Sequence, residues 1–127
     1  MGNLDELSMS QEPDPYFILA GGGTSRDVFP GVQIHAIAGQ GMMLSIVDLA
    51  EGSAVPEHSH PHEQMGIMVS GRLEFTIGDV TRIVGPGDCW RIPGQIPHKA
   101  RCLEGPAVAL DVFHPVRDDY LPLRTED

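Results

Sequence analysis

Short apolar runs, each broken after a few residues by glycine, proline or aspartate, recur along most of the chain. Runs of this length with turn-forming residues between them favour β-strands joined by hairpins. No segment shows the longer apolar stripe of an amphipathic helix. The chain is therefore predicted to be all-β, forming a sandwich or a barrel. The predicted strands cover residues 32–38, 42–49, 64–69, 72–77, 80–84, 88–92, 98–102 and 107–113.

The length and charge of the chain limit what it can do. Its 127 residues suffice for one domain with a single core. Eighteen acidic against eight basic residues give a formal charge of −10, which argues against nucleic acid or an anionic membrane as a partner. No apolar run approaches the ~20 residues of a membrane-spanning helix, and no secretory signal is visible. Two cysteines, Cys89 and Cys102, suggest no disulfide framework, so a reduced, cytoplasmic protein is expected.

The N-terminal residues differ from the rest in composition. Residues 1–15 are polar and acidic and contain two prolines, so a flexible arm is predicted there, followed by one folded domain over residues 16–127. The alternative is an arm that adds a strand to a partner subunit, beginning with the apolar residues 16–19. A homodimer is expected, because small barrels leave a sheet edge or an apolar outer face exposed. Four methionines are expected to pack inside the barrel, namely Met42, Met43, Met65 and Met68.

Histidines gather between two apolar runs, where His58, His60 and His62 occupy alternate positions. Side chains two residues apart on a strand point to the same side, so two imidazoles can converge on one ion. Imidazole nitrogens are donors that first-row transition metals prefer. A third donor a few residues on and a fourth from elsewhere would complete the site. The candidate fourth donor is His98, which follows a rigid turn between Pro93 and Pro97.

These positions belong to two motifs that together resemble those of the cupin family. The motifs are Gly52-x5-His58-x-His60-x3-Gln64-x6-Gly71 and Gly87-x5-Pro93-x-Gln95-x2-His98-x3-Cys102. The chain departs from the usual pattern at Gln64, Gln95 and Cys102, where most members have Glu, Gly and Asn. The resemblance covers roughly residues 31–115 and is that of small single-domain bacterial cupins. It implies a double-stranded β-helix, or jelly-roll, barrel that binds one divalent metal ion.

A narrower resemblance, to the pectin-degradation cupins, lies in residues 58–64 together with Asp111-x-Phe113-x3-Arg117. That group opens unsaturated uronates derived from pectin or alginate into linear keto forms. The resemblance implies an acidic, sugar-derived small molecule as the substrate. It also implies four metal ligands and three catalytic residues beside the metal. The implied ligands are His58, His60, Gln64 and His98, and the implied catalytic residues are Asp111, Phe113 and Arg117.

The ligand set has alternatives. His62 has the same parity as the other histidines, but it follows Pro61 in a turn. Glu63 could replace Gln64 if the turn were tighter, although its parity is wrong. A neutral amide at position 64 leaves the full charge on the ion, which favours isomerisation or ring opening by a Lewis acid. Imidazole and amide donors suit Ni, Zn, Fe, Mn or Co, and availability decides among them, so the identity of the metal stays open.

Asp111 and Phe113 alternate on one predicted strand and can both line the cavity. Asp111 would then move a proton, and Arg117 would hold a substrate carboxylate through its planar fork. A salt bridge from Asp111 to Arg117 or Arg91 is an equally weighted alternative.

Two other functions remain open on the same barrel, because one fold hosts many chemistries. The first is an Fe(II)-dependent dioxygenase, which would consume oxygen. The second is a non-catalytic cupin that binds a small acid.

Overall fold

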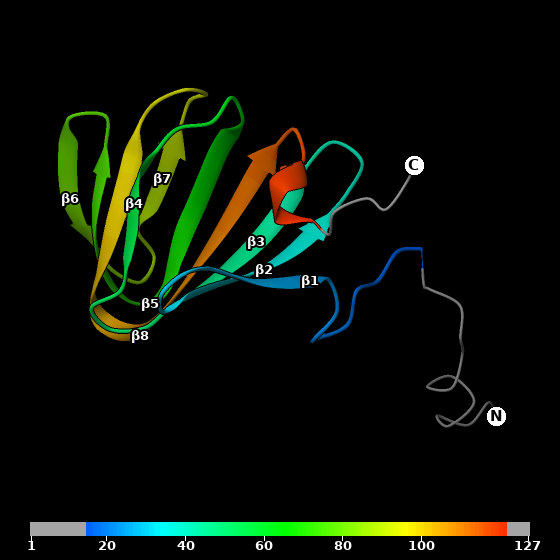
Figure 1. Ribbon diagram of the computed structural model, residues 1–127, viewed down its shortest axis with the longest axis horizontal. Helices are drawn as coiled ribbons and strands as arrows, with labels where there is room; N and C mark the ends of the chain where they lie inside the picture. Colours follow the sequence, from blue (N-terminus) through cyan, green and yellow to red (C-terminus); the bar gives the residue numbers. More distant parts are fainter. Residues whose placement is uncertain (1–14, 122–127) are drawn as a thin grey trace.

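The structure, a computed structural model, describes residues 15–121, and these form eight strands and one short 3-10 helix (Figure 1). The prediction of an all-β chain is confirmed. The elements are β1 (Thr24–Phe29), β2 (Val32–Ala38), β3 (Met43–Leu49), β4 (Ala54–His58), β5 (Glu63–Ile77), β6 (Val80–Val84), β7 (Cys89–Ile92), β8 (His98–His114) and η1 (Asp118–Tyr120). Among the described residues no helix is long and apolar enough to cross a bilayer.

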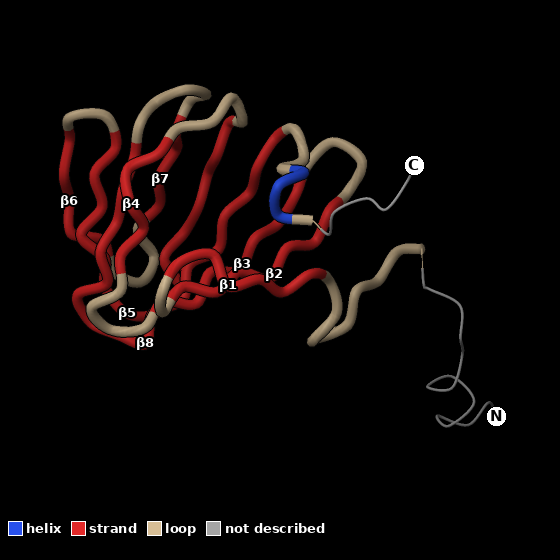
Figure 2. Tube along the Cα trace, in the orientation of Figure 1, coloured by secondary structure: helices blue, strands red, loops and turns tan. Residues whose placement is uncertain are grey.

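The two longest strands, β5 and β8, pair antiparallel along most of their length and connect two sets of strands (Figure 2). The C-terminal half of β8 and the N-terminal half of β5 lie in the order β1-β2-β3-β8-β5-β7. The other halves of the same strands pair with β4 and β6. Core residues of both sets belong to one cluster, for example Val32 and Leu49 with Leu73 and Phe75, so the two sets pack face to face.

Gly71 allows β5 to pass from one set of strands to the other. Its φ of 80° lies in the left-handed region, and a Cβ there would meet Ala107 and the carbonyl of Glu104. The pairing of β5 with β8 shifts register around this point, so the chain bends as a β-bulge without reversing direction. The prediction of two strands, residues 64–69 and 72–77, joined by a hairpin was therefore wrong. Residues 98–102 and 107–113 are likewise parts of one strand, β8.

Two strands carry too little apolar sequence to have been predicted. β1 reads TSRDVF, and β4 reads AVPEH with a proline inside it. Both are ordered by pairing at one side, β1 with β2 and β4 with β8. The apolar residues 16–19 form no strand within this chain, and their pairing with a partner subunit stays a prediction. Residues 1–14 of the predicted arm lie outside the described residues.

The outer face of β3, β5 and β8 is apolar. The methionine prediction holds for Met43 and Met68, which are buried, and is wrong for Met42 and Met65, which are 58% and 52% exposed. Neighbouring strands add further exposed apolar side chains to this face, because the register places Leu44 and Ile46 of β3 beside Val112 and Leu110 of β8. We call this surface the outer apolar face; its exposed members are Leu44, Ile46, Met65, Ile67 and Val69.

Candidate metal centre

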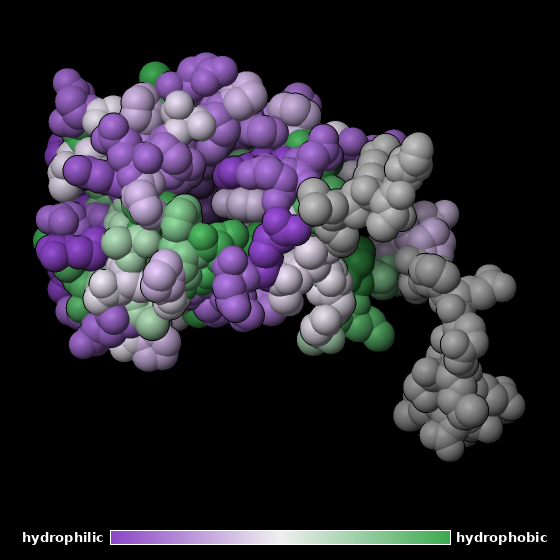
Figure 3. Space-filling view, viewed as in Figure 1, coloured by the Kyte–Doolittle hydropathy of each residue, from purple (hydrophilic) through white to green (hydrophobic). Residues whose placement is uncertain are grey.

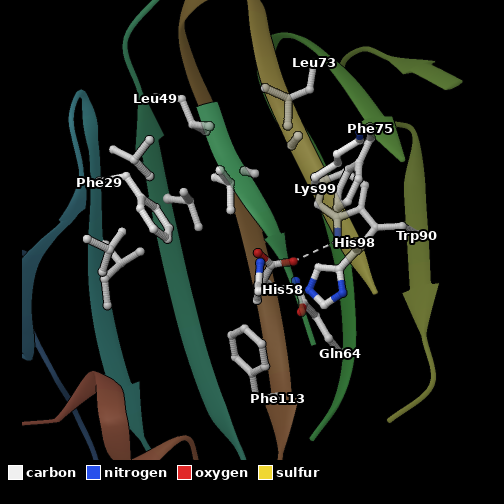
Figure 4. A pocket seen from close by; sticks show the side chains of 18 of the residues that line it. Phe29, Leu49, His58, Gln64, Leu73, Phe75, Trp90, His98, Lys99 and Phe113 are labelled. Carbon is white, nitrogen blue, oxygen red and sulfur yellow. Dashed lines mark hydrogen bonds between the residues drawn. The ribbon is translucent and has the colours of Figure 1, made fainter. Parts of the chain in front are cut away.

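Three imidazoles converge at one end of the space between the two sets of strands. His58 ends β4, His98 begins β8, and the two are partners in the β4–β8 register. His60 comes from the loop that follows β4. One ring nitrogen of each histidine lies within 4.8 Å of the others, and the His58 and His98 ring centroids are 4.3 Å apart. Figure 4 shows His58, His98 and Gln64 gathered at the same cavity.

The loop that carries His60 is fixed from the other side of the site. The N–H of Gln95 donates a hydrogen bond of 2.7 Å to the carbonyl of His60. Gln95 adopts a φ of 70°, the left-handed conformation that favours glycine, which accounts for the glycine usual at this motif position. Gly94 beside it packs against Pro61 so closely that a Cβ would collide with the Pro61 carbonyl. The turn before His98 therefore holds His60 in place.

Each imidazole is oriented by a hydrogen bond from Nδ1 to a backbone carbonyl. His58 and His98 donate to the carbonyls of Pro56 and Ile96, both at 2.9 Å. His60 donates to the carbonyl of His62 at 3.1 Å. Such bonds fix the proton on Nδ1 and leave the Nε2 lone pair for a ligand. Within the described residues, the buried Nε2 of His98 has no hydrogen-bond partner.

Gln64 supplies a fourth donor. Its side chain is buried, and its Oε1 lies 3.1 Å from Nε2 of His60. Because the proton of His60 is on Nδ1, its Nε2 is an acceptor, as is Oε1 of Gln64. Two acceptors this close repel each other unless a cation lies beside them. Three neutral imidazoles and an amide oxygen are a donor set that suits divalent first-row metals. The residues therefore fit a divalent metal ion.

The protonation of the histidines agrees with this assignment. Burial, with smaller contributions from the charge of Arg117 and from His98, lowers the pKa of His60 to about 4. Burial likewise lowers the pKa of His98. Imidazole must be neutral to bind a metal, so these rings are ready ligands at neutral pH.

Neither alternative ligand belongs to the group of three histidines, although the His62 ring centroid lies 5.4 Å from that of His60. The side chain of Glu63, the first residue of β5, is exposed, as its parity predicts. His62 is not among the histidines that converge, although its carbonyl orients His60.

Asp111 is buried behind Gln64. Its Oδ1 accepts a hydrogen bond of 2.8 Å from Nε1 of Trp90, and the Gln64 amide donates a second one. Burial raises the pKa of Asp111 to about 6, against the opposing effects of these hydrogen bonds and of the charge of Arg117. The predicted alternative, an ion pair with Arg117 or Arg91, is wrong. Arg117 pairs with Asp119, and Arg91 is exposed on β7.

Arg117 is buried beside the site. Its guanidinium carbon lies 5.1 Å from the ring centroid of Phe113 and 4.0 Å from that of Tyr120. Two of its nitrogens donate to the carboxylate of Asp119, and a third donates to the hydroxyl of Tyr120. Burial opposes ionisation of Asp119, but the hydrogen bonds and charge of Arg117 outweigh it and hold the pKa of that carboxyl below its usual range.

Sequence reasoning gave no role to Trp90, Asp119 or Tyr120. Two features of the sequence could have pointed to them. A buried tryptophan needs an acceptor for its indole N–H, and a short polar run follows Arg117.

Two connected hollows lead to the site. The inner cavity, of about 60 Å³, is lined by His58, Gln64, His98, Asp111 and Phe113 among others. An outer hollow of about 310 Å³ shares Phe29, His58, Arg117 and Tyr120 with it and is also lined by Arg26 of β1. The surface is visibly hollowed near the centre of this side of the molecule (Figure 3). The two hollows therefore adjoin at His58 and Arg117.

Comparison with known proteins identifies relatives of this barrel. The structure of KdgF from Halomonas sp. is similar with a TM-score of 0.77 and 30% sequence identity, over 85% of this chain and 100% of that one. The H2HPP isomerase of Bacillus subtilis is 42% identical over 48 residues, and the dimethylsulfoniopropionate lyase DddQ of Ruegeria pomeroyi is 35% identical over 66 residues. The chain spans only 20% and 33% of the length of these two proteins.

The family model of the cupin domain matches residues 45–113, more than half of the chain. This range holds the four candidate metal donors together with Asp111 and Phe113. The predicted jelly-roll barrel is confirmed, as is the resemblance to small single-domain cupins most like those of pectin degradation. The chain belongs to the cupin domain family.

Proposed function

We propose that this protein is a metal-dependent enzyme that opens an unsaturated uronate into its linear keto form. The observation that carries the proposal is the grouping of a metal-ligand cluster, a buried carboxyl and a buried guanidinium around one cavity. The similarity to KdgF over the whole length of that chain supports it. The similarity to the isomerase and the lyase named above supports an enzymatic function, although the chain covers only part of each protein.

In this proposal His58, His60, Gln64 and His98 hold one divalent ion. The ion, when bound, acts as a Lewis acid toward an oxygen atom of the substrate. Gln64 contributes no charge, so the site keeps the positive character that an acidic ligand needs in a chain of formal charge −10. The amide is held with its oxygen toward His60, because its nitrogen donates to Asp111.

Asp111 is the proposed acid and base. A carboxyl with a pKa of about 6 exchanges its proton readily near neutral pH. Trp90 fixes one carboxyl oxygen, so the group keeps its position while a proton is taken up and returned. Phe113 packs edge-on against His60, with ring centroids 5.7 Å apart, and forms an apolar wall that excludes water. Arg117 is the proposed partner of the substrate carboxylate.

The test begins with metal analysis of the purified full-length protein. The metal-loaded protein is then incubated with a 4,5-unsaturated uronate, and the loss of ultraviolet absorbance is followed. We expect faster loss than in buffer or with chelator-treated protein. No acceleration overturns the proposal. Oxygen uptake with Fe(II) would instead identify a dioxygenase, and binding without turnover a non-catalytic cupin.

We also propose that two copies of the chain pair through the outer apolar face. The exposed side chains of β3 and β5 flank the half-buried Leu110 and Val112 of β8, so the face is continuous across three strands. Contiguous apolar surface of this kind on a sheet marks an interaction site. A two-fold pairing brings the same face of each copy together and covers both.

A further inference from the structure

Arg117 already binds a carboxylate, and that carboxylate belongs to the chain itself. Nη2 of Arg117 lies 2.7 Å from Oδ2 of Asp119, and Nε lies 3.2 Å from Oδ1. Two parallel bonds of this kind are the arrangement that an arginine forms with any free carboxylate. The remaining terminal nitrogen, Nη1, donates to the hydroxyl of Tyr120 at 3.0 Å.

A ligand carboxylate can reach Arg117 at the edge formed by Nε and Nη2, which Asp119 occupies. The aromatic rings of Phe113 and Tyr120 lie against the guanidinium group. The Arg117 side chain is only 9% exposed, whereas that of Asp119 is 58% exposed. Asp119 therefore lies on the solvent side of Arg117, in the outer hollow that leads to the inner cavity.

We infer that Asp119 occupies the position of the ligand's carboxylate, so that an acidic ligand binds Arg117 by exchanging one carboxylate for another. The inference rests on the proposed function only in taking the ligand to be a small carboxylic acid. Removing Asp119 without replacement would leave a buried guanidinium unpaired, which is strongly unfavourable. An acid compensates for that loss and a neutral sugar does not. The Arg117–Asp119 pair thus selects for a carboxylate.

Asp119 is placed so that it can leave. It lies in the three-residue turn η1, and no residue of that turn is buried. Arg26 holds the turn through the backbone carbonyls of Asp119 and Leu121, at 3.2 and 3.3 Å. These bonds do not involve the Asp119 carboxylate, which can rotate into water while the turn stays attached. The exchange requires only a side-chain movement.

Ligand binding to the metal-loaded full-length protein tests this inference without turnover. Calorimetry compares D-galacturonate with its neutral counterpart D-galactose, in wild type and in two variants. Asp119→Asn removes the competing charge, and Asp118→Asn makes the same change in net charge one residue away, at an exposed side chain. Thermal unfolding verifies that both variants are folded.

We expect Asp119→Asn to bind galacturonate about three- to tenfold more tightly than wild type, and Asp118→Asn to stay within about twofold. Galactose binding should be the same in all three proteins. Asp119→Asn binding that is equal to or weaker than that of Asp118→Asn overturns the inference, as does the absence of galacturonate binding in Asp119→Asn. If the tightening is found but the unsaturated uronate is not turned over, the carboxylate position stands and the proposed reaction fails.

Discussion

The indole N–H of Trp90 donates to the carboxyl of Asp111 directly over Gly66. Trp90 on β7 and Asp111 on β8 are both register partners of Gly66, which lies on β5 between them. Their hydrogen bond of 2.8 Å therefore spans the central strand. A Cβ at position 66 would collide with the indole and with the Asp111 carboxyl. The glycine creates the space in which the buried carboxyl is positioned.

Gly66→Ala is expected to destabilise the protein. The added methyl group pushes Trp90 and Asp111 apart, and leaving buried polar groups without partners costs about 1–3 kcal/mol. Urea unfolding of the metal-free protein measures the change in the free energy of unfolding. Gly85→Ala is the matched control, because a Cβ there meets only Cγ of Arg72 at 3.8 Å, an ordinary contact. Equal stability of the two variants would contradict the argument.

Local sequence predicted the strands other than β1 and β4 and singled out the three histidines that converge, because both depend on nearby residues. Alternation places side chains on faces, and the histidines lie in short motifs whose spacing fixes their geometry. The hairpin expected at Gly71 was wrong because a glycine with positive φ serves a β-bulge as well as a turn. Only the pairing of β5 with β8 decides between them.

The environment of Asp111 could not be predicted in the same way. Its contact with Trp90 spans 21 residues and depends on the register of three strands. The pairing of Arg117 with Asp119 follows from the path of the chain after β8, where no periodic pattern exists. The alternative of an ion pair between Arg117 and Asp111 was therefore wrong, although both residues line the same cavity.

Asp111→Ala is expected to lose turnover of the unsaturated uronate while keeping the metal. Loss of a positioned acid or base typically lowers the rate ~10²–10⁴-fold. Steady-state kinetics and metal stoichiometry are measured on the same preparation. Arg117→Ala provides the contrast, since loss of the carboxylate partner should mainly raise KM. If Asp111→Ala lost its metal in parallel with its activity, Asp111 would support the ligands instead of moving a proton.

Added metal is expected to raise the melting temperature of chelator-treated protein. A ligand that binds only the folded state at 100 times its Kd stabilises that state by about 2.7 kcal/mol. The shift should vanish in the His58→Ala/His98→Ala variant. It should persist in His35→Ala, because His35 lies outside the cluster and contacts Ser25 and Asp48. A double variant that retained stoichiometric metal at the original affinity would place the site elsewhere.

Light scattering at micromolar concentration is expected to give twice the 13.7 kDa mass of one chain. Ile67→Asp places a charge within the outer apolar face and should yield the monomer, because an unpaired charge is costly to bury. Val80→Asp is the control at an exposed position on β6, away from that face, and should leave the mass unchanged. A monomeric wild type would refute the pairing.

Gln64→Glu is expected to destabilise the metal-free protein, although glutamate is the usual residue at this position in cupins. The Gln64 amide donates to Asp111 and cannot be replaced there by a carboxylate oxygen. At pH 8 two ionised carboxyl groups would face each other, and like charges in one buried site repel. Thermal unfolding in the presence of chelator measures the loss.

The loss should depend on pH in a defined direction. The pKa of Asp111 is about 6, so at pH 5 its carboxyl is mostly protonated and can donate to the carboxylate at position 64. The melting temperature of Gln64→Glu should therefore lie further below that of wild type at pH 8 than at pH 5. Adding Asp111→Asn to Gln64→Glu should recover stability at pH 8, because the new amide can accept from Trp90 and donate to position 64. A deficit that is independent of pH and is not reduced by Asp111→Asn would show that Gln64 and Asp111 are not coupled.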